Sequence, residues 1–120
     1  MGWHIAWVKL GLVAIIAALT AACSRDPSAG PGDGPAVFRS LCTSCHGEDG
    51  RPPAAMIARL GVRDLTAAEF RARVTPDLVE HQVRAGSKNK LMPSFEGVLD
   101  DAKIKAVAGY VASPRFVAPP

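Results

Sequence analysis

Two cysteines and a histidine stand close together in the run Cys42-Thr43-Ser44-Cys45-His46. Two thiols three positions apart on one helical turn can each add to a vinyl group of the same porphyrin. The histidine that follows can then place a ring nitrogen on the iron. The C-x-x-C-H pattern therefore predicts covalent attachment of a c-type haem through Cys42 and Cys45, with His46 as an iron ligand.

A methionine followed by a proline lies further along the chain, in Leu91-Met92-Pro93-Ser94-Phe95. A thioether from Met92 would complete a His/Met pair of axial ligands, which raises the reduction potential of a haem iron. Packing in the core is the alternative role for such a methionine. Met56 falls on the same side of the haem as His46, and a mid-helix His81 between charged residues is more often solvated. Met92 is therefore the predicted sixth ligand.

Two other chemistries are open to the same cysteines. A zinc site would need a fourth ligand, and His81 is the one left after Cys42, Cys45 and His46. A disulfide between Cys42 and Cys45 is the other alternative. Neither accounts for Met92 or for the helical pattern around the motif, so the sequence favours haem.

Composition limits the remaining classes of function. The 120 residues leave room for one domain, and 14 Lys and Arg against 11 Asp and Glu give a net charge of +3. No run of like charge suggests a nucleic-acid partner. No nucleophile stands beside a base and no carboxylates are paired, so neither an enzyme site nor a small-molecule substrate is predicted.

The N-terminus has the form of an export signal over residues 1–22, with an apolar run from Leu10 to Ala22. This run covers about 20 Å as a helix, less than the ~30 Å that a spanning helix must cross. Small residues followed by Cys23 resemble the lipobox of bacterial lipoproteins, in which this cysteine receives lipid. Residues 23–33 are then a flexible, lipid-anchored linker. The expected location is the periplasmic side of a bacterial membrane.

Two alternatives to the lipid anchor remain. Ordinary cleavage of the signal would leave Cys23 free and the protein soluble in the periplasm. Without cleavage, residues 3–22 would form an anchor interrupted by Lys9.

Helical patterns begin after the linker. Gly34, Phe38 and Cys42 fall on one face of a first helix that starts near Asp33. A last helix is predicted from Asp100 as N-cap to a stop before Pro114, with an apolar face formed by Ile104, Val107, Ala108 and Val111.

Two further helices are predicted between these. The run Thr66-Ala67-Ala68-Glu69 has capping-box form and predicts a helix towards Val74. Thr75 as N-cap, with Pro76 at the first position, predicts a helix that ends near Ala85 with Gly86 as its stop. No strand is predicted.

Together these residues resemble the class I cytochrome c family. The family's first helix carries Gly and Phe eight and four residues before the first haem cysteine, as Gly34 and Phe38 do here. An aromatic residue of its last helix crosses near that glycine, in the place of Tyr110. The run from Arg84-Ala85-Gly86 through Met92-Pro93-Ser94-Phe95 resembles the family's methionine-ligand region.

The resemblance implies an all-α fold of three to five helices packed around one covalent haem c. The cytochrome domain would span residues 34–113, followed by a C-terminal tail over residues 114–120. It also implies a one-electron carrier that shuttles electrons between membrane and periplasmic redox partners. Two alternatives are an electron-transfer subunit of a larger oxidoreductase and a haem-based sensor whose methionine detaches.

The resemblance also suggests residues around the haem. Pro52 and Pro53 fall where the family often has a prolyl carbonyl that accepts a hydrogen bond from the ligand histidine, and the resemblance does not decide between them; Pro53 is a candidate for the haem surroundings. Arg51 is a candidate for the haem propionates, as are Arg59 and Arg63, although ordinary surface charge is an alternative for all three.

A positive rim is expected beside the methionine, formed by Arg84, Lys88 and Lys90. Such a rim would steer a redox partner with an acidic docking surface. An ordinary solvated loop is the alternative.

Overall fold

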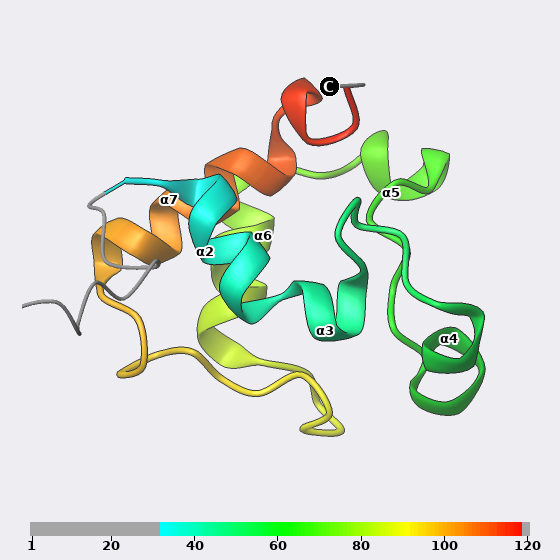
Figure 1. The fold of residues 1–120 in the computed structure, drawn as a ribbon. Helices are drawn as coiled ribbons and strands as arrows, with labels where there is room; N and C mark the ends of the chain where they lie inside the picture. The colour runs from blue at the N-terminus through cyan, green and yellow to red at the C-terminus, as the bar shows by residue number, and fades with distance from the viewer. Residues whose placement is uncertain (1–31, 119–120) are drawn as a thin grey trace, which may run out of the picture.

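The computed structural model describes residues 32–118 (Figure 1). The described part is helical, as predicted, and apart from an isolated bridge between Glu96 and Leu99 it contains no β-structure. The elements in chain order are α2 (Gly34–Leu41), α3 (Thr43–His46), α4 (Ala54–Leu60), α5 (Ala68–Arg71), α6 (Pro76–Ala85), α7 (Asp101–Ala112) and the 3-10 helix η1 (Pro114–Phe116). The predicted signal and linker, including Cys23, lie outside the described residues.

Helix α2 begins as predicted, because Asp33 accepts a hydrogen bond from the Ala36 N–H at 3.0 Å. Gly34 is buried where α2 crosses α7. A Cβ at this position would collide with the carbonyl oxygen of Ala106 and would lie 2.7 Å from the Cβ of Tyr110. The glycine therefore sets how closely the two helices approach.

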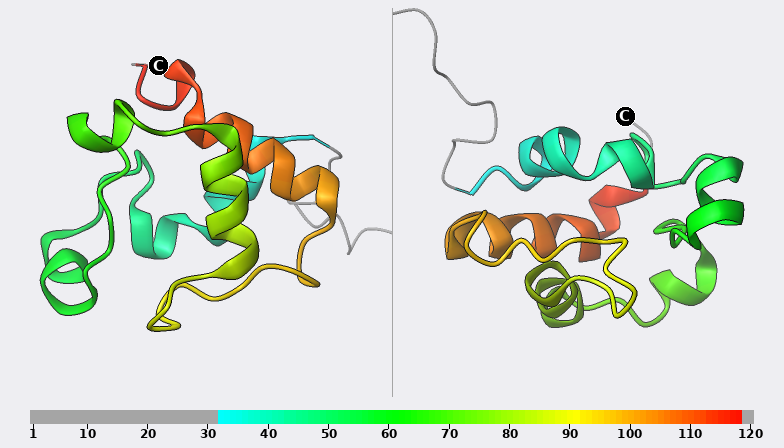
Figure 2. Two further views of the ribbon diagram at one scale, coloured as in Figure 1. Left: turned by 180° about the vertical axis from the view of Figure 1, so that it is seen from behind. Right: turned by 90° about the horizontal axis from the view of Figure 1, so that it is seen from below.

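Helices α6 and α7 also follow the sequence prediction. Thr75 caps α6 by accepting from the Leu78 N–H at 3.2 Å, and Asp100 caps α7 by accepting from the Lys103 N–H at 2.8 Å. Gly86 ends α6 with a φ of 71°, in the left-handed region that favours glycine. Helix α7 lies between α2 and α6 in the right-hand view of Figure 2 and packs on both.

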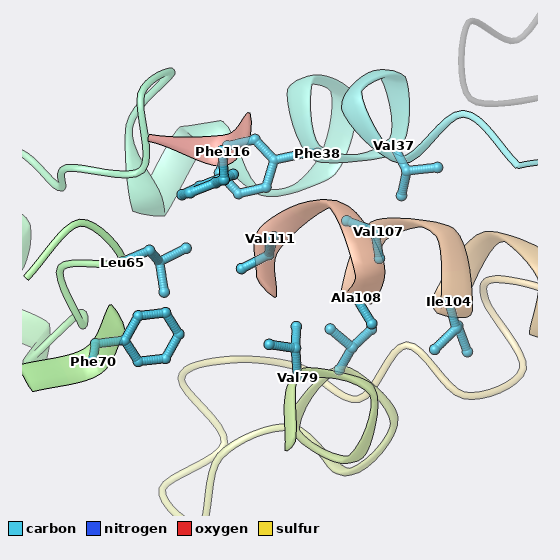
Figure 3. Packing of buried hydrophobic residues seen from close by; sticks show 11 residues of the cluster. Val37, Phe38, Leu65, Phe70, Val79, Ile104, Val107, Ala108, Val111 and Phe116 are labelled. Atoms are coloured by element: carbon cyan, nitrogen blue, oxygen red, sulfur yellow. The ribbon is translucent and has the colours of Figure 1, made fainter. Parts of the chain in front are cut away.

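The core lies along α7. Its four predicted apolar residues are all buried, and Figure 3 shows them between the side chains of α2 and those of α6. Val37 and Phe38 contribute from α2, and Val79 and Val83 from α6. The Phe38 ring meets the ring of Phe116 edge-on at a centroid distance of 5.0 Å. Burial of these side chains is the main source of stability for the packed helices.

The C-terminal end adds more to the fold than the expected tail. Helix η1 turns Phe116 back into the core, where it is 7% exposed and contacts both Phe38 and Tyr110. The core thus extends beyond residue 113, the expected limit of the domain.

The predicted capping box at Thr66 is wrong. The Thr66 hydroxyl donates instead to Asp64 Oδ1 at 2.6 Å, and the Thr66 N–H donates to the same oxygen at 2.8 Å. Thr66 does not cap the helix: α5 begins after Ala67, without a side-chain cap, and ends at Arg71. The helix is therefore shorter than predicted.

Helix α4 stands apart from the packed helices and buries none of its residues (Figure 1). Its Ile57 and Leu60 are 45% and 38% exposed. The segment that carries α4 and α5 is joined to the core mainly through Leu65 and Phe70, which are buried among the core side chains.

Candidate functional site

Helix α3 carries the cysteines and histidine of the C-x-x-C-H motif. Cys42 links α2 to α3: its N–H donates to the Phe38 carbonyl, and its carbonyl accepts from the His46 N–H, both at 2.9 Å. Gly47 ends the turn with a φ of 78°. The motif is helical and directly continues the helix that packs on α7.

The two thiols are half-buried and are not joined by a disulfide. Burial, followed by the neighbouring Cys45, raises the pKa of the Cys42 thiol to about 11. Zinc is the alternative to haem that the sequence leaves open for these two thiols. The fourth ligand of that alternative, His81, is exposed on α6, and no three His, Cys, Asp or Glu side chains within residues 32–118 are grouped to hold a metal.

The His46 ring is oriented by a backbone group. Its Nδ1 lies 3.2 Å from the carbonyl oxygen of Arg63. A carbonyl can only accept, so Nδ1 carries the proton and Nε2 keeps a lone pair for a metal. Burial lowers the pKa of His46, partly opposed by this hydrogen bond, and therefore favours the neutral ring that can ligate.

The expected prolyl partner of His46 is therefore corrected. Pro53 is exposed and precedes α4 as its N-cap residue, and Pro52 is buried, but the carbonyl that His46 contacts belongs to Arg63. Arg63 lies 17 residues after His46. The chain returns to the histidine after α4, and this return is not visible in local sequence patterns.

Met92 and Cys42 face one apolar pocket. The pocket is bounded by α2, α6, α7 and the segment after Met92, and its lining consists of Val37, Leu41, Cys42, Val83, Met92, Phe95, Leu99 and Val107. No polar side chain contributes to it. The fold thus brings the first motif cysteine and the predicted sixth ligand, far apart in the chain, to the same apolar surface. Apolar walls with a thiol and a thioether among them are chemically suited to contact a haem group.

Met92 is held close to the end of α6. The positive φ of Gly86 turns the chain, and a Cβ there would lie 2.6 Å from the Met92 carbonyl oxygen. Further along, the Phe95 N–H donates to the Val83 carbonyl at 3.0 Å, and the Ser94 hydroxyl donates to the Arg84 carbonyl. The segment that follows Met92 is thereby fixed to α6 by two hydrogen bonds.

Arg84 does not contribute a free charge to the expected positive rim. Its guanidinium lies 2.9 Å from Glu80 and 2.9 Å from Asp101, and 3.9 Å from Glu96. The hydrogen bonds that the guanidinium donates to Glu80 and Asp101 raise the pKa of Arg84. Arg84 instead ties α6, the methionine segment and α7 together, which sequence reasoning missed because its partners Glu96 and Asp101 come from later segments.

Lys88 and Lys90 are both exposed in the loop between α6 and Met92, and neither forms a salt bridge within the described residues. Of the expected rim, these two lysines remain. Arg51 is also exposed, and its guanidinium donates to Thr66 Oγ1 at 3.4 Å. Arg51 and Pro53 do not line the pocket that contains Cys42 and Met92.

Arg71 is a structural residue that the sequence did not reveal. Its guanidinium donates to the carbonyls of Val111, Ala112 and Ser113 at 2.7, 3.3 and 2.9 Å. It also lies 5.7 Å from the ring centroid of Phe116. Arg71 caps the end of α7 from the segment that carries α5, so it joins that segment to the packed helices.

Comparison with known proteins agrees with this arrangement. Residues 29–111 match the family model described as "Cytochrome C oxidase, cbb3-type, subunit III". The chain belongs to the cytochrome c family. It is 34% identical over 82 residues to cytochrome c6 of Euglena viridis, an alignment that covers 67% of this chain and 87% of the relative.

A solved structure, KustC0563 c-type cytochrome, is similar to this cytochrome, with a TM-score of 0.59 and 29% sequence identity. The match covers 67% of this chain and 94% of that chain. The all-α cytochrome c fold is therefore confirmed, and so is a single covalent haem c as cofactor. Family membership supports a haem-based electron carrier.

Proposed function

We propose that this cytochrome carries one electron at a time on a haem attached to Cys42 and Cys45, with His46 and Met92 as axial ligands. The observation that supports it most is the shared apolar pocket of Cys42 and Met92. His46 stands four positions after Cys42, and its Nδ1 contact with the Arg63 carbonyl leaves Nε2 to serve as the other iron ligand.

The bound haem supplies an iron that changes oxidation state. The protein supplies the surroundings: apolar walls that exclude water, a histidine ring fixed by the Arg63 carbonyl, and a methionine fixed to α6. With His46 and Met92 both bound, no position remains for a substrate. An electron carrier follows from that ligand set, and an enzyme does not.

The partner side of the proposal is the loop that carries Lys88 and Lys90. Both lysines are exposed and form no salt bridge within the described residues, and Leu91 beside them is 52% exposed. A redox partner with acidic groups around an apolar centre fits such a surface, and its association should weaken as salt is added. Arg84 is not part of this proposed surface, because its positive charge is paired with carboxylates of the same protein.

Membrane attachment through lipid on Cys23 is also proposed, on the sequence pattern described above. Within residues 32–118 no helix has the length and apolar character to span a bilayer. Replacement of Cys23 by Ser should release the protein into the periplasmic fraction if lipid anchors it; retention in the membrane fraction would support the uncleaved N-terminal anchor.

A second candidate is an electron-transfer subunit of a larger oxidoreductase. It is favoured by the match to a family model that describes a subunit of an oxidase. A permanent subunit should co-purify with stoichiometric partners after mild extraction, whereas a mobile carrier should elute alone.

The experiment that tests the proposed ligation is the optical spectrum of the dithionite-reduced protein before and after addition of carbon monoxide. A His46/Met92 iron should leave c-type bands unchanged by carbon monoxide. A prompt spectral shift would show an open or labile sixth position and would favour the sensor alternative.

A further inference from the structure

The backbone of Met92 is held by a single residue, Ser87. The Ser87 N–H donates to the Met92 carbonyl oxygen at 2.9 Å, and the Met92 N–H donates to the Ser87 hydroxyl oxygen at 2.9 Å. Both polar backbone groups of the proposed ligand are therefore occupied by the same partner. The second of these bonds depends on the serine side chain.

The Ser87 hydroxyl is itself oriented by Asn89. It donates to Asn89 Oδ1 at 2.6 Å, and the same oxygen accepts from the Leu91 N–H at 3.2 Å. A hydroxyl that donates on one side becomes a better acceptor on the other. Asn89 therefore directs the lone pairs of Ser87 towards the Met92 N–H.

The loop from Ser87 to Met92 is closed by a further hydrogen bond, which the Lys90 N–H donates to the Ser87 carbonyl at 2.9 Å. Lys90 has a φ of 60° and is the one non-glycine residue with positive φ in the described part of the chain. A side chain in this region costs free energy, so such a conformation persists where its surroundings impose it. The imposed geometry is a closed ring from Ser87 to Met92.

We propose that Ser87 is the positioning residue for Met92, which holds the methionine backbone so that its thioether reaches the iron. The inference rests on the proposed His46/Met92 ligation. Methionine has a long, flexible side chain, and its thioether is a weak ligand. Fixing its backbone beforehand reduces the freedom that ligation must remove, and ligation is tighter as a result.

Other contacts in the same region anchor the chain without holding the methionine itself. Ser94 donates to the Arg84 carbonyl, and Phe95 donates to the Val83 carbonyl, but neither contacts Met92 through a hydrogen bond. Removal of the Ser87 hydroxyl should therefore weaken the ligation of Met92 even if it changes the free energy of unfolding little.

The test uses Ser87→Ala in the haem-loaded protein and measures how fast imidazole replaces Met92 on the ferric iron. Loss of one hydrogen bond to the closed arrangement should speed the exchange roughly three- to tenfold. Ser113→Ala is the matched control, because it likewise removes one serine hydroxyl that forms a hydrogen bond, here to the Tyr110 carbonyl at the C-terminal end of α7. Its exchange rate should equal that of the unaltered protein.

Three more variants separate positioning from general stability. Ser87→Thr keeps the hydroxyl and should restore slow exchange. Asn89→Ala removes the acceptor of the Ser87 hydroxyl and should speed exchange less than Ser87→Ala does. Asn89→Asp keeps an acceptor oxygen and should exchange more slowly than Asn89→Ala. If Ser87→Ala does not fold, the two Asn89 variants carry the test.

Equal exchange rates for Ser87→Ala and Ser113→Ala, or for the two Asn89 variants, would overturn the positioning role. Failure of the underlying ligation looks different. In that case the unaltered protein would bind imidazole as fast as Met92→Ala does, before any change at Ser87.

Discussion

Helices α2, α6 and α7 pack on one another through buried aliphatic and aromatic side chains, whereas the segment from Thr43 to Val74 buries few of its residues. In the packed part, Val37 and Ile104 are fully buried. In the other part, α4 contributes no buried residue, and Ile57 on it is 45% exposed. Figure 2 shows the same contrast, with α4 away from the three packed helices.

The difference in burial indicates different roles for the packed helices and for the segment from Thr43 to Val74. The packed helices form a scaffold that holds Cys42 and Met92 against one apolar pocket. The segment from Thr43 to Val74 carries Cys45 and His46 and returns to contact the His46 ring through the Arg63 carbonyl. We interpret the first part as stable through helix packing and the second as arranged around the group that it holds.

The largest effect is expected for Phe38→Ala. Phe38 is 2% exposed and contacts the rings of Tyr110 and Phe116 edge-on. Its removal should lower the free energy of unfolding by about 3–5 kcal/mol, measured by guanidinium denaturation of the haem-loaded protein. Ile57→Ala on α4 should cost less than half as much, and equal losses would erase the distinction between the two parts.

Arg71→Met tests the connection between the two parts. Loss of three charge-assisted hydrogen bonds to the end of α7 should cost about 1.5–3 kcal/mol of unfolding free energy, while the aliphatic stem is kept. Arg73 is a suitable comparison, since its guanidinium contacts one exposed carbonyl, that of Glu69, and Arg73→Met should be nearly neutral. If both variants are neutral, Arg71 does not join the parts.

Two glycines sharpen the description of the packed part. Gly34→Ala would place a methyl group against the backbone of Ala106 and should cost about 1–3 kcal/mol of unfolding free energy. Gly109→Ala meets nothing within 4 Å and should gain about 0.5–1 kcal/mol from helix propensity. The midpoint temperature of thermal denaturation should fall for Gly34→Ala and rise for Gly109→Ala. A shift of the same sign in both would contradict the close crossing at Gly34.

The smallest effect concerns acid stability of the segment from Thr43 to Val74. The hydrogen bond from Thr66 is the main reason that the pKa of Asp64 lies below its ordinary 3.8. A lowered pKa stabilises the folded protein above that ordinary value, and this contribution is lost as the pH falls through the lowered one. Thr66→Val should therefore reduce the change in unfolding free energy with pH, by less than about 1 kcal/mol.

The check for this effect is urea denaturation of the two proteins between neutral pH and pH values below the ordinary pKa of Asp64. In an Asp64→Asn background, Thr66→Val should not change the pH dependence. A change that persists there would assign the effect to another group.

The three packed helices could be predicted from the sequence because their signals are local. Asp33, Thr75 and Asp100 cap the helix that directly follows each of them, and the apolar face of α7 has regular spacing. The capping box at Thr66 was a local signal too, but the Thr66 side chain and N–H both turn back to the Asp64 carboxylate. Short-range patterns are reliable where no neighbour offers a better partner.

The surroundings of the site could not be predicted because they depend on contacts between distant segments. The proposed ligands follow from residue type and spacing, but the carbonyl beside His46 comes from Arg63, after α4. Arg84 looked like a free charge because its partners Glu96 and Asp101 lie in later segments. Only the folded chain shows these neighbours.

The central claim is that Met92 reaches the iron, and proton NMR of the ferrous protein with labelled methionine methyl groups tests it most directly. The described chain contains Met56 and Met92. An axial methionine lies in the ring current of the haem, so one methyl signal should move far upfield. We predict that this signal disappears in Met92→Ala and remains in Met56→Ala. Absence of a shifted methyl signal, or its loss in Met56→Ala, would contradict the account.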